Sequence, residues 1–295
     1  MKSSRQVSGR GWEETRMDAI RYEKHYEAQD ARITVDFITD HGQYHAAHWQ
    51  KELEMIYLLN GNAHIILDGE NISLVQGDFI VIDSNHIFDL KCKESFMQVR
   101  VHVDKEFLAM RAGSTVPRVY RCIRENLEGD QLEPYLRICD HFKELVPLYI
   151  NEPEGYRLKT ESIVLSILYH LVHHFSYPVS VDEITEPRAE QTRIQQILQY
   201  IEEHYTERIS LADISSEFGL SREYFSRLFH KSLGISFSEH VNRVRISHFY
   251  HDLVTGDEPV MELLEKNGLT DYKLFSRMFR EIYGNTPKEI RKLTT

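Results

Sequence analysis

The chain has 295 residues, of which 41% are hydrophobic and 27% charged, a composition typical of a globular protein of about two domains. Its three cysteines have neither the number nor the spacing of a disulfide framework or a zinc motif, and no apolar run approaches the ~18 residues of a membrane span. The formal net charge is −11, but residues 188–295 hold 15 basic and 16 acidic residues, so a basic face there stays compatible with nucleic acid. These features predict a cytoplasmic protein.

Short strands are predicted between residues 31 and 105. Runs rich in β-branched and aromatic residues are separated by the turn-forming runs NGN, DGEN and QGD, and they read ITVDFIT, LEMIYLL, HIILD, DFIVID and FMQVRVHV. Many short strands at regular spacing are typical of a small barrel or sandwich. Residues 1–30, which are charged and poor in apolar side chains, are predicted to form an N-terminal arm.

A helical connector is predicted over residues 106–187. The runs LEPYLRICDHFKELVPLYI and YRLKTESIVLSILYHLVHHF have helical periodicity. The second run carries an apolar stripe made of Val164, Ile167, Leu168, Leu171, Val172 and Phe175. Such a stripe packs on its own domain or forms a dimer interface, and both alternatives stay open. The segment 176–190, with two prolines and no periodicity, is the predicted domain boundary.

The remaining domain, residues 188–295, is predicted to be all helical and to contain the same plan twice. The first copy has a helix over 211–218, a Gly219-Leu220 turn and a helix after Ser221. The second copy has a helix over 260–266, a Gly268-Leu269 turn and a further helix. Each is the plan of a helix-turn-helix unit. A helix over 238–253 joins the two units and can set two recognition helices in successive major grooves, about 34 Å apart.

The second helix of each unit is amphipathic. The runs YFSRLFHKSLGISF and LFSRMFREIYGNTP repeat Phe-Ser-Arg-x-Phe and a closing glycine 50 residues apart, so an aromatic face is buried and a Ser-Arg pair faces outward in both. Arginine reads guanine or binds phosphate. The candidate DNA-binding residues are Arg222, Glu223, Ser226, Arg227, His230 and Lys231 in the first unit, and Tyr272, Lys273, Ser276, Arg277 and Arg280 in the second.

The segments ISLADISSEFGLSREYFSRLFHKSLGISFSEHVNRVRI and GLTDYKLFSRMFREIYGNTPKEIRK resemble the AraC/XylS family of bacterial transcriptional regulators over about 100 residues. The resemblance implies double-stranded promoter DNA as a partner, RNA polymerase if the protein is an activator, and activation as the family tendency. The sequence departs from the family pattern at packing positions, where Ser215, Leu264 and Phe249 replace alanines and Leu269 replaces a phenylalanine. The base contacts that it implies fall at Glu223, Ser226 and Arg227, and at Tyr272, Lys273, Ser276 and Arg277.

The segment from His48 to Phe88 resembles the cupin-like effector domain that is often fused to this module. Metal cupins place histidines where Gln50 and Phe88 stand, so no metal and no cofactor are expected unless His86 or His45 is recruited. A barrel mouth with such side chains suits a sugar or a related metabolite. The candidate effector-binding residues are His48, Trp49, Gln50, Glu54, His86 and Phe88.

The resulting prediction is an α+β protein with a cupin-like β-barrel over 31–105, a helical connector that supports a homodimer, and a double helix-turn-helix domain. Its predicted function is sequence-specific DNA binding in response to a small-molecule effector, without enzymatic activity. One alternative is a metal-dependent cupin enzyme of the sugar isomerase type with a helical interaction domain. Another is a binding module whose helical half docks protein partners.

Overall fold

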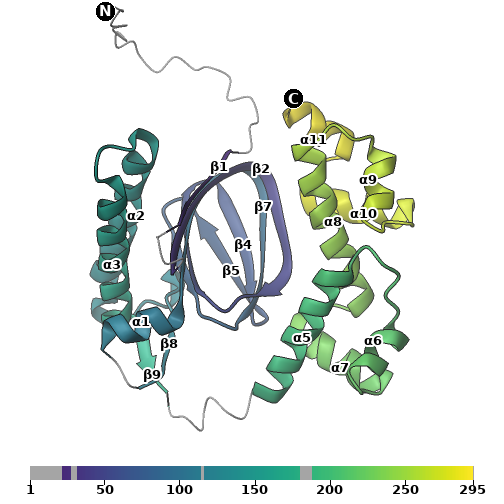
Figure 1. Ribbon diagram of the computed structural model, residues 1–295, viewed down its shortest axis with the longest axis horizontal. Coiled ribbons are helices and arrows are strands. Elements are labelled where there is room, and N and C mark those ends of the chain that lie inside the picture. Colours follow the sequence, from purple (N-terminus) through teal and green to yellow (C-terminus); the bar gives the residue numbers. More distant parts are fainter. Residues whose placement is uncertain (1–21, 28–31, 114–115, 180–187, 295) are drawn as a thin grey trace, which may run out of the picture.

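The computed structural model describes residues 22–27, 32–113, 116–179 and 188–294. The predicted arm of residues 1–30 lies outside these ranges apart from residues 22–27, and so does the 180–187 part of the predicted domain boundary. Figure 1 shows three layers, with a pair of helices on one side of a curled sheet and a separate group of helices on the other. Within the described ranges no helix is long and apolar enough to cross a membrane.

Seven antiparallel strands form the sheet. All five predicted runs fall on strands, while β1 and β5 were not predicted: β1 is polar at most positions, and half of β5 is polar. The strands are β1 (Tyr22–Glu27), β2 (Ile33–Trp49), β3 (Leu53–Asn60), β4 (Asn62–Leu67), β5 (Glu70–Val75), β6 (Phe79–Ile82) and β7 (Ile87–Val103).

Strand β7 organises the sheet because it is long enough to pair with three neighbours. It pairs with β2 over nearly its whole length, with β3 through residues 97–103 and with β4 through residues 88–91. The strand order is β1-β2-β7-β3-β6, and β5 is added at the far side of β4. A strand shared in this way makes the sheet curl on itself, as Figure 1 shows. The predicted α+β class is confirmed.

The two faces of the curled sheet have different cores. Val99, Val101 and Val103 point outward and pack with Phe142 and Ile167 of the connector helices. The inner face holds a second cluster that includes Ile56, Ile65, Ile80, Phe88 and Leu90. The connector consists of α1 (Lys105–Ala112), β8 (Arg118–Tyr120), two short 3-10 turns, α2 (Leu132–Asn151), α3 (Tyr156–His174) and β9 (Ser176–Pro178).

The apolar stripe of α3 lies in the core between α2 and the sheet. Ile167 and Leu171 have no exposed surface, and Val164 and Phe175 are equally well buried. Of the two alternatives that the sequence left open for this stripe, packing on its own domain is the one that the structure has.

A charged cluster lies on the inner face of the sheet. The Glu54 carboxylate is 1% exposed and lies 3.7 Å from Nε of Arg100 and 3.5 Å from Nε2 of His102. Burial on its own raises the pKa of Glu54, but the hydrogen bond to His102 and the charge of Arg100 outweigh it and lower the pKa to about 2. Burial lowers the pKa of His102, and hydrogen bonds to Asp36 and Glu54 reverse this and raise it to about 9. The cluster therefore holds its charges through mutual pairing.

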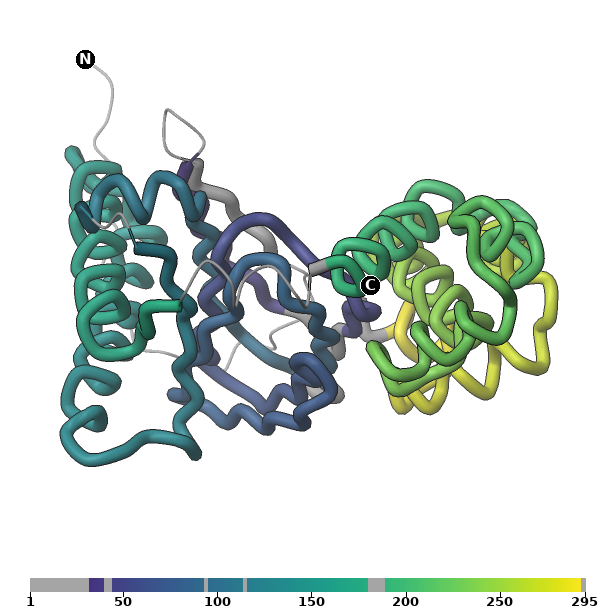
Figure 2. Tube along the Cα trace, turned by 90° about the horizontal axis from the view of Figure 1, so that it is seen from below, coloured from purple at the N-terminus to yellow at the C-terminus, as the bar shows by residue number. Residues whose placement is uncertain are grey.

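The C-terminal helices bury one continuous core. The first helix contributes Ile194, Ile197, Leu198 and Ile201, all of which are buried. The helices are α5 (Arg188–His204), α6 (Leu211–Glu217), α7 (Arg222–Leu233), α8 (Phe237–Thr255), α9 (Val260–Lys266), α10 (Tyr272–Tyr283) and α11 (Pro287–Thr294). We call α6 with α7 the first unit and α9 with α10 the second unit. Figure 2 shows these helices as a body that meets the sheet along one side.

The two units have the same turn. The amide of Leu220 donates to the Ser215 carbonyl at 2.8 Å, and the amide of Leu269 donates to the Leu264 carbonyl at the same distance. The preceding glycines, Gly219 and Gly268, have φ values of 63° and 66°, which residues with a side chain rarely adopt. The bulky Leu264 is itself buried, so this departure from the family pattern leaves the turn intact.

The two turn glycines are predicted to respond differently to the same substitution. A Cβ on Gly268 would lie 2.6 Å from the Thr206 carbonyl oxygen, while one on Gly219 would have no neighbour within 4 Å. We expect Gly219→Ala to lower the free energy of unfolding by about 1–2 kcal/mol, the cost of the left-handed conformation. Gly268→Ala should lower the free energy of unfolding by roughly 1–3 kcal/mol more, because the backbone must shift. Urea denaturation measures both, and equal losses would contradict the difference in packing.

The charged cluster predicts a pH dependence of stability. The folded-state pKa of His102 is raised above its ordinary 6.5, so its stabilising contribution is complete below that pH and is lost as pH rises through about 9. The pKa of Glu54 is lowered, so its contribution is present above its ordinary 4.5 and is lost as pH falls toward about 2. We therefore expect His102→Gln to flatten the fall in Tm on the alkaline side. His64→Gln, an exposed histidine of β4, is the matched control, and an unchanged alkaline slope in His102→Gln would disprove the assignment.

Candidate nucleic-acid interface and interdomain cavity

The two candidate recognition helices begin with equivalent caps. The side chain of Ser221 accepts a hydrogen bond from the amide of Tyr224 at the start of α7, and Asp271 accepts one from Leu274 at the start of α10. Both helices end at a glycine in the left-handed conformation, Gly234 or Gly284. The caps satisfy amides that lack partners within the helix, so the same boundaries are set locally in both units.

The aromatic face of each helix is buried, as the repeat predicts. Phe225 and Phe229 have no exposed surface, and Phe275 and Phe279 are 2% and 0% exposed. The eleven candidate DNA-binding residues lie on the remaining faces. Ser276 is half-buried, and the other ten are exposed: Arg222, Glu223, Ser226, Arg227, His230 and Lys231 on α7, and Tyr272, Lys273, Arg277 and Arg280 on α10. The structure thus brings each predicted set together on one helix surface.

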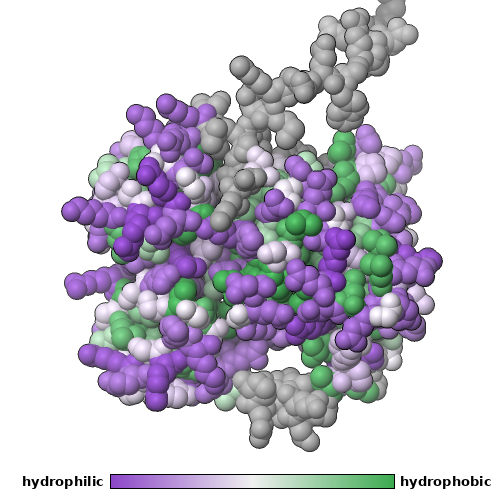
Figure 3. Space-filling view, turned by 180° about the vertical axis from the view of Figure 1, so that it is seen from behind, coloured by the Kyte–Doolittle hydropathy of each residue, from purple (hydrophilic) through white to green (hydrophobic). Residues whose placement is uncertain are grey.

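The two surfaces differ in charge pairing. On α7, Nζ of Lys231 lies 2.9 Å from a carboxylate oxygen of Glu190, so this lysine is tied to α5. On α10, a shallow groove is lined by Tyr272, Lys273, Ser276, Arg277, Arg280 and Glu281. Three of these side chains are basic and one is acidic, which makes the groove attractive to phosphate. Figure 3, from behind, shows hydrophilic side chains over most of the visible surface of the C-terminal helices.

Helix α8 connects the two units through aromatic contacts. Its Phe237 lies edge-on to Phe225 with ring centroids 5.5 Å apart. At the other end of the helix, the Phe249 ring lies 4.8 Å from that of Phe275. Phe249 occupies a position where the family pattern has alanine, and the structure gives it the role of a contact to the second recognition helix.

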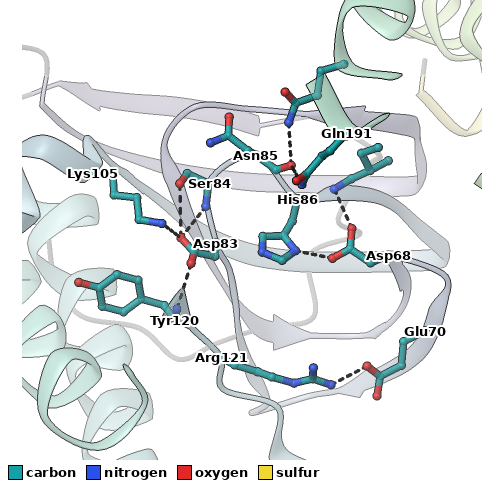
Figure 4. Close-up of polar contacts among 12 residues, drawn as sticks. Asp68, Glu70, Asp83, Ser84, Asn85, His86, Lys105, Tyr120, Arg121 and Gln191 are labelled. Atoms are coloured by element: carbon teal, nitrogen blue, oxygen red, sulfur yellow. Dashed lines mark hydrogen bonds and ion pairs between the residues drawn. The ribbon is translucent and has the colours of Figure 1, made fainter. Parts of the chain in front are cut away.

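The sheet and the C-terminal helices meet at an irregular part of β2. The pairing of β2 with β7 shifts between His45 and His48, and Tyr44 just before this bulge and Ala46 within it pack in the core of the helical domain. The indole of Trp49 donates to the Gln195 carbonyl at 3.0 Å. Figure 4 shows Gln191 directed at Asn85, whose carbonyl accepts hydrogen bonds of 2.8 Å from both Gln191 and Gln195. The two domains therefore share a polar and apolar contact.

A cavity of about 840 Å³ opens between β2 and the helices α5 and α8. Three of the six candidate effector-binding residues line it, namely His48, Trp49 and Gln50. Glu54 lies behind this wall and accepts a 2.7 Å hydrogen bond from the Gln50 amide. Phe88 is 1% exposed and its ring lies 4.4 Å from that of His48, so it supports this histidine from below.

His86 lies elsewhere. Figure 4 shows its ring directed at Asp68, to which Nδ1 is hydrogen-bonded, on the side of the turn that faces α1 and β8. Burial is the largest single effect on the pKa of His86 and lowers it, but the hydrogen bond to Asp68 and the charges of Asp68 and Asp83 together outweigh burial and raise the pKa. Nearby, the buried Asp83 accepts hydrogen bonds from Lys105 and from the Tyr120 amide. These contacts hold the turn in place and do not bring His86 into the cavity of His48.

The opposite wall of the cavity comes from the C-terminal domain. It includes Glu202 of α5 and His240, Ser247 and His248 of α8. Sequence reasoning missed these residues, because each lies more than 140 positions from His48 and none belongs to a motif. Only His240 has a signal that could have found it, its helical spacing of three residues from Phe237 and four from Val244.

Two histidines of the cavity are held neutral. Burial lowers the pKa of His48, whose Nδ1 donates to the Ala46 carbonyl at 2.9 Å. Burial, together with the charge of Arg243, lowers the pKa of His240 to about 3. Glu202 pairs with His248 at 2.6 Å at the rim. The deeper part of the cavity therefore offers uncharged imidazoles, an indole and an amide.

The residues at the cupin metal positions do not fit a metal. Gln50 is hydrogen-bonded to Glu54, and the phenyl ring of Phe88 packs on His48. Among the residues that the structure describes, no group of three or more histidine, cysteine or acidic side chains is arranged to hold an ion.

Comparisons with known proteins address the C-terminal units. A family model described as a helix-turn-helix domain matches residues 214–293, which span most of both units. A protein named as an HTH-type transcriptional regulator from Staphylococcus aureus is 24% identical over 236 residues, covering 80% of this chain. The chain spans only 31% of that relative's length. The regulator YisR from Bacillus subtilis is 22% identical over 279 residues, covering 86% of this chain and 90% of YisR.

A solved structure of ToxT from Vibrio cholerae is similar at 14% identity and a TM-score of 0.49, covering 90% of this chain and 99% of ToxT. The two units repeat Phe-Ser-Arg-x-Phe, the glycine turn and the closing glycine within the matched residues. The C-terminal part of the chain is therefore a helix-turn-helix domain of the AraC type.

Proposed function

We propose that this protein is a transcriptional regulator that binds double-stranded promoter DNA through α7 and α10 and responds to a small molecule bound between its two domains. The observation that carries the proposal is the pair of equivalent recognition helices. Each has a buried aromatic face and an outward surface with a Ser-Arg pair, Ser226-Arg227 or Ser276-Arg277. Packing of the core does not by itself require two equivalent outward surfaces, whereas two such surfaces match successive major grooves of a duplex.

Both recognition helices are fixed to α8, which supports a shared DNA site. Phe237 and Phe249 lie 12 residues apart on α8, which corresponds to about 18 Å along the helix axis. The contacts of Phe237 to α7 and of Phe249 to α10 therefore separate the recognition helices along one rigid element. One chain then reads a site that proteins with a single motif read as dimers.

A sugar or a related uncharged metabolite is the proposed effector. The cavity volume is within the range of small-molecule sites, and its deeper wall offers the Trp49 ring, the Gln50 amide and neutral imidazoles. The charged lining consists of Glu52, Glu202, Glu203 and one cation, Lys51. This excess of carboxylates disfavours anionic ligands.

We propose a regulator and not a metal-dependent cupin enzyme. The hydrogen bond of Gln50 to Glu54 and the packing of Phe88 on His48 occupy the positions where a metal cupin holds its ion. Activity in the cytoplasm and contact with RNA polymerase at an activated promoter are parts of the same proposal.

A homodimer is proposed through the outer surface of the connector helices. The apolar stripe of α3 is used within its own domain, but large apolar side chains remain on the outside of α2 and α3. Leu136, Leu158, Leu165 and Tyr169 are 50%, 76%, 41% and 64% exposed. Two chains that cover these residues would bring four recognition helices to one promoter.

Replacement of the outward arginines is the direct test of DNA binding. We expect Arg227→Ala and Arg277→Ala each to weaken binding to a duplex selected from random sequences by about 1–3 kcal/mol, and to relax preference at one base position, if the guanidinium reads a base. Electrophoretic mobility shift with selected and random duplexes measures both effects.

The matched control is Arg137→Ala, an exposed arginine on α2 that pairs with Glu133 far from both units. It should leave DNA affinity unchanged. Equal losses on selected and random duplexes would assign the arginines to phosphate contacts. Unchanged DNA affinity in both Arg227→Ala and Arg277→Ala would contradict the proposed interface and favour the protein-docking alternative.

A further inference from the structure

We propose that His240 of the DNA-binding domain is itself a ligand-binding residue, and that an uncharged, hydrogen-bonding effector bridges it to His48, Trp49 and Gln50 of the sheet. This inference rests on the proposed function and deepens it, since it places the effector in direct contact with α8. The sequence pointed only to residues of the sheet domain as effector contacts.

The burial of His240 is the first observation. The residue is 1% exposed and lines the cavity, yet within the described ranges its Nδ1 has no hydrogen-bond partner. A buried polar atom without a partner loses about 1–3 kcal/mol relative to one that is satisfied. Neighbouring polar side chains between the domains are paired: Gln195 donates to the Asn85 carbonyl, and the Tyr44 hydroxyl accepts from Arg243. A ligand in the cavity that donates to or accepts from Nδ1 would satisfy the atom.

The position of His240 on α8 is the second observation. The His240 ring lies 5.5 Å from that of Phe229, which belongs to the buried face of the first recognition helix. Four residues further along α8, Val244 lines the same cavity, and Ser247 follows with a hydrogen bond to the Tyr44 carbonyl. A ligand that contacts this side of α8 therefore touches the element that spaces the two recognition helices.

The opposing wall defines the ligand class. Nδ1 of His48 is already used by the Ala46 carbonyl, and the carboxylate of Glu54 is already shared by Gln50, His102 and Arg100. No buried charge at this wall is left for an ionic ligand to neutralise. Trp49 presents an aromatic ring of the kind that packs on the apolar face of a sugar. An uncharged polyhydroxylated molecule fits this combination better than an anion or a polyamine.

The bridge has a consequence for regulation. A ligand held by both domains stabilises the arrangement in which β2 is docked on α5 and α8, so it changes DNA affinity to the extent that DNA prefers or disfavours this arrangement. Coupling of this kind is reciprocal, and the factor by which ligand changes DNA affinity equals the factor by which DNA changes ligand affinity.

The experiment uses the full chain and a panel of D-glucose, L-arabinose, L-rhamnose, myo-inositol, glucose phosphate and spermidine, read out by thermal unfolding and isothermal titration. We expect at least one neutral compound to raise Tm. His240→Phe keeps the ring and its packing on Phe229 but removes both nitrogens, and it should weaken the Kd of that compound about tenfold, as for one lost hydrogen bond. His240→Gln, which keeps a hydrogen-bonding group, should recover part of the affinity.

His173→Phe, an exposed histidine of α3, is the control and should bind as the parent protein does. The Tm of each variant without ligand shows that it is folded. A Kd that is unchanged in His240→Phe, a response to the phosphate or to spermidine alone, or a panel without any neutral binder would each overturn the inference. DNA binding by the ligand-free protein is measured in parallel: if it persists in these cases, the proposed function stands and only the role of His240 falls, whereas its loss in the parent protein would remove the proposed function itself.

Discussion

Burial of the aromatic faces of α7 and α10 is the constraint on which the rest of the C-terminal domain depends. A fully buried phenylalanine contributes about 1.5–3 kcal/mol through its removal from water, so a helix with two of them has one orientation that is strongly preferred. That orientation directs Ser226-Arg227 and Ser276-Arg277 to the outside. Helix α8 receives both faces, one near each of its ends, and their separation along α8 is therefore set by helix geometry.

The contact between the domains is made at an irregular part of strand β2. The pairing of β2 with β7 is interrupted between His45 and His48, and Ala46 in this bulge packs against the helices beside Tyr44, which precedes it. His48 follows the bulge and lines the cavity, backed by Phe88. One short part of β2 thus contributes both to the docking contact and to one wall of the proposed effector site.

Charged groups and uncharged polar groups lie in different places in the sheet domain. Glu54, Arg100 and His102 pair with one another in the charged cluster. The Gln50 amide, which lines the cavity, donates a hydrogen bond to Glu54 and so links the cluster to the cavity. His48 and His240 of the cavity are uncharged by contrast, because burial has the largest effect on the pKa of each and lowers it. Ionic interactions hold the charged cluster together, and neutral hydrogen-bonding groups line the proposed effector site.

The amino-acid sequence by itself determined the helix-turn-helix units, because caps, glycine turns and a 3.6-residue period are local properties. Residues such as Ser221, Gly219 and Phe225 act within one turn or on one helix face, so their roles can be predicted from the residues next to them in the sequence. It also determined most strands of the sheet, through alternation and turn residues. Strand β5 was not predicted because it is short and has only two buried apolar residues, and the arm that includes β1 has no strand pattern. Only the tertiary structure decided which residues lie opposite His48 in the cavity. His240 is 192 positions away in the sequence and lines the same cavity because the two domains dock on each other. Contacts of that kind arise from shape and burial between surfaces that are far apart in the chain, and no local period encodes them.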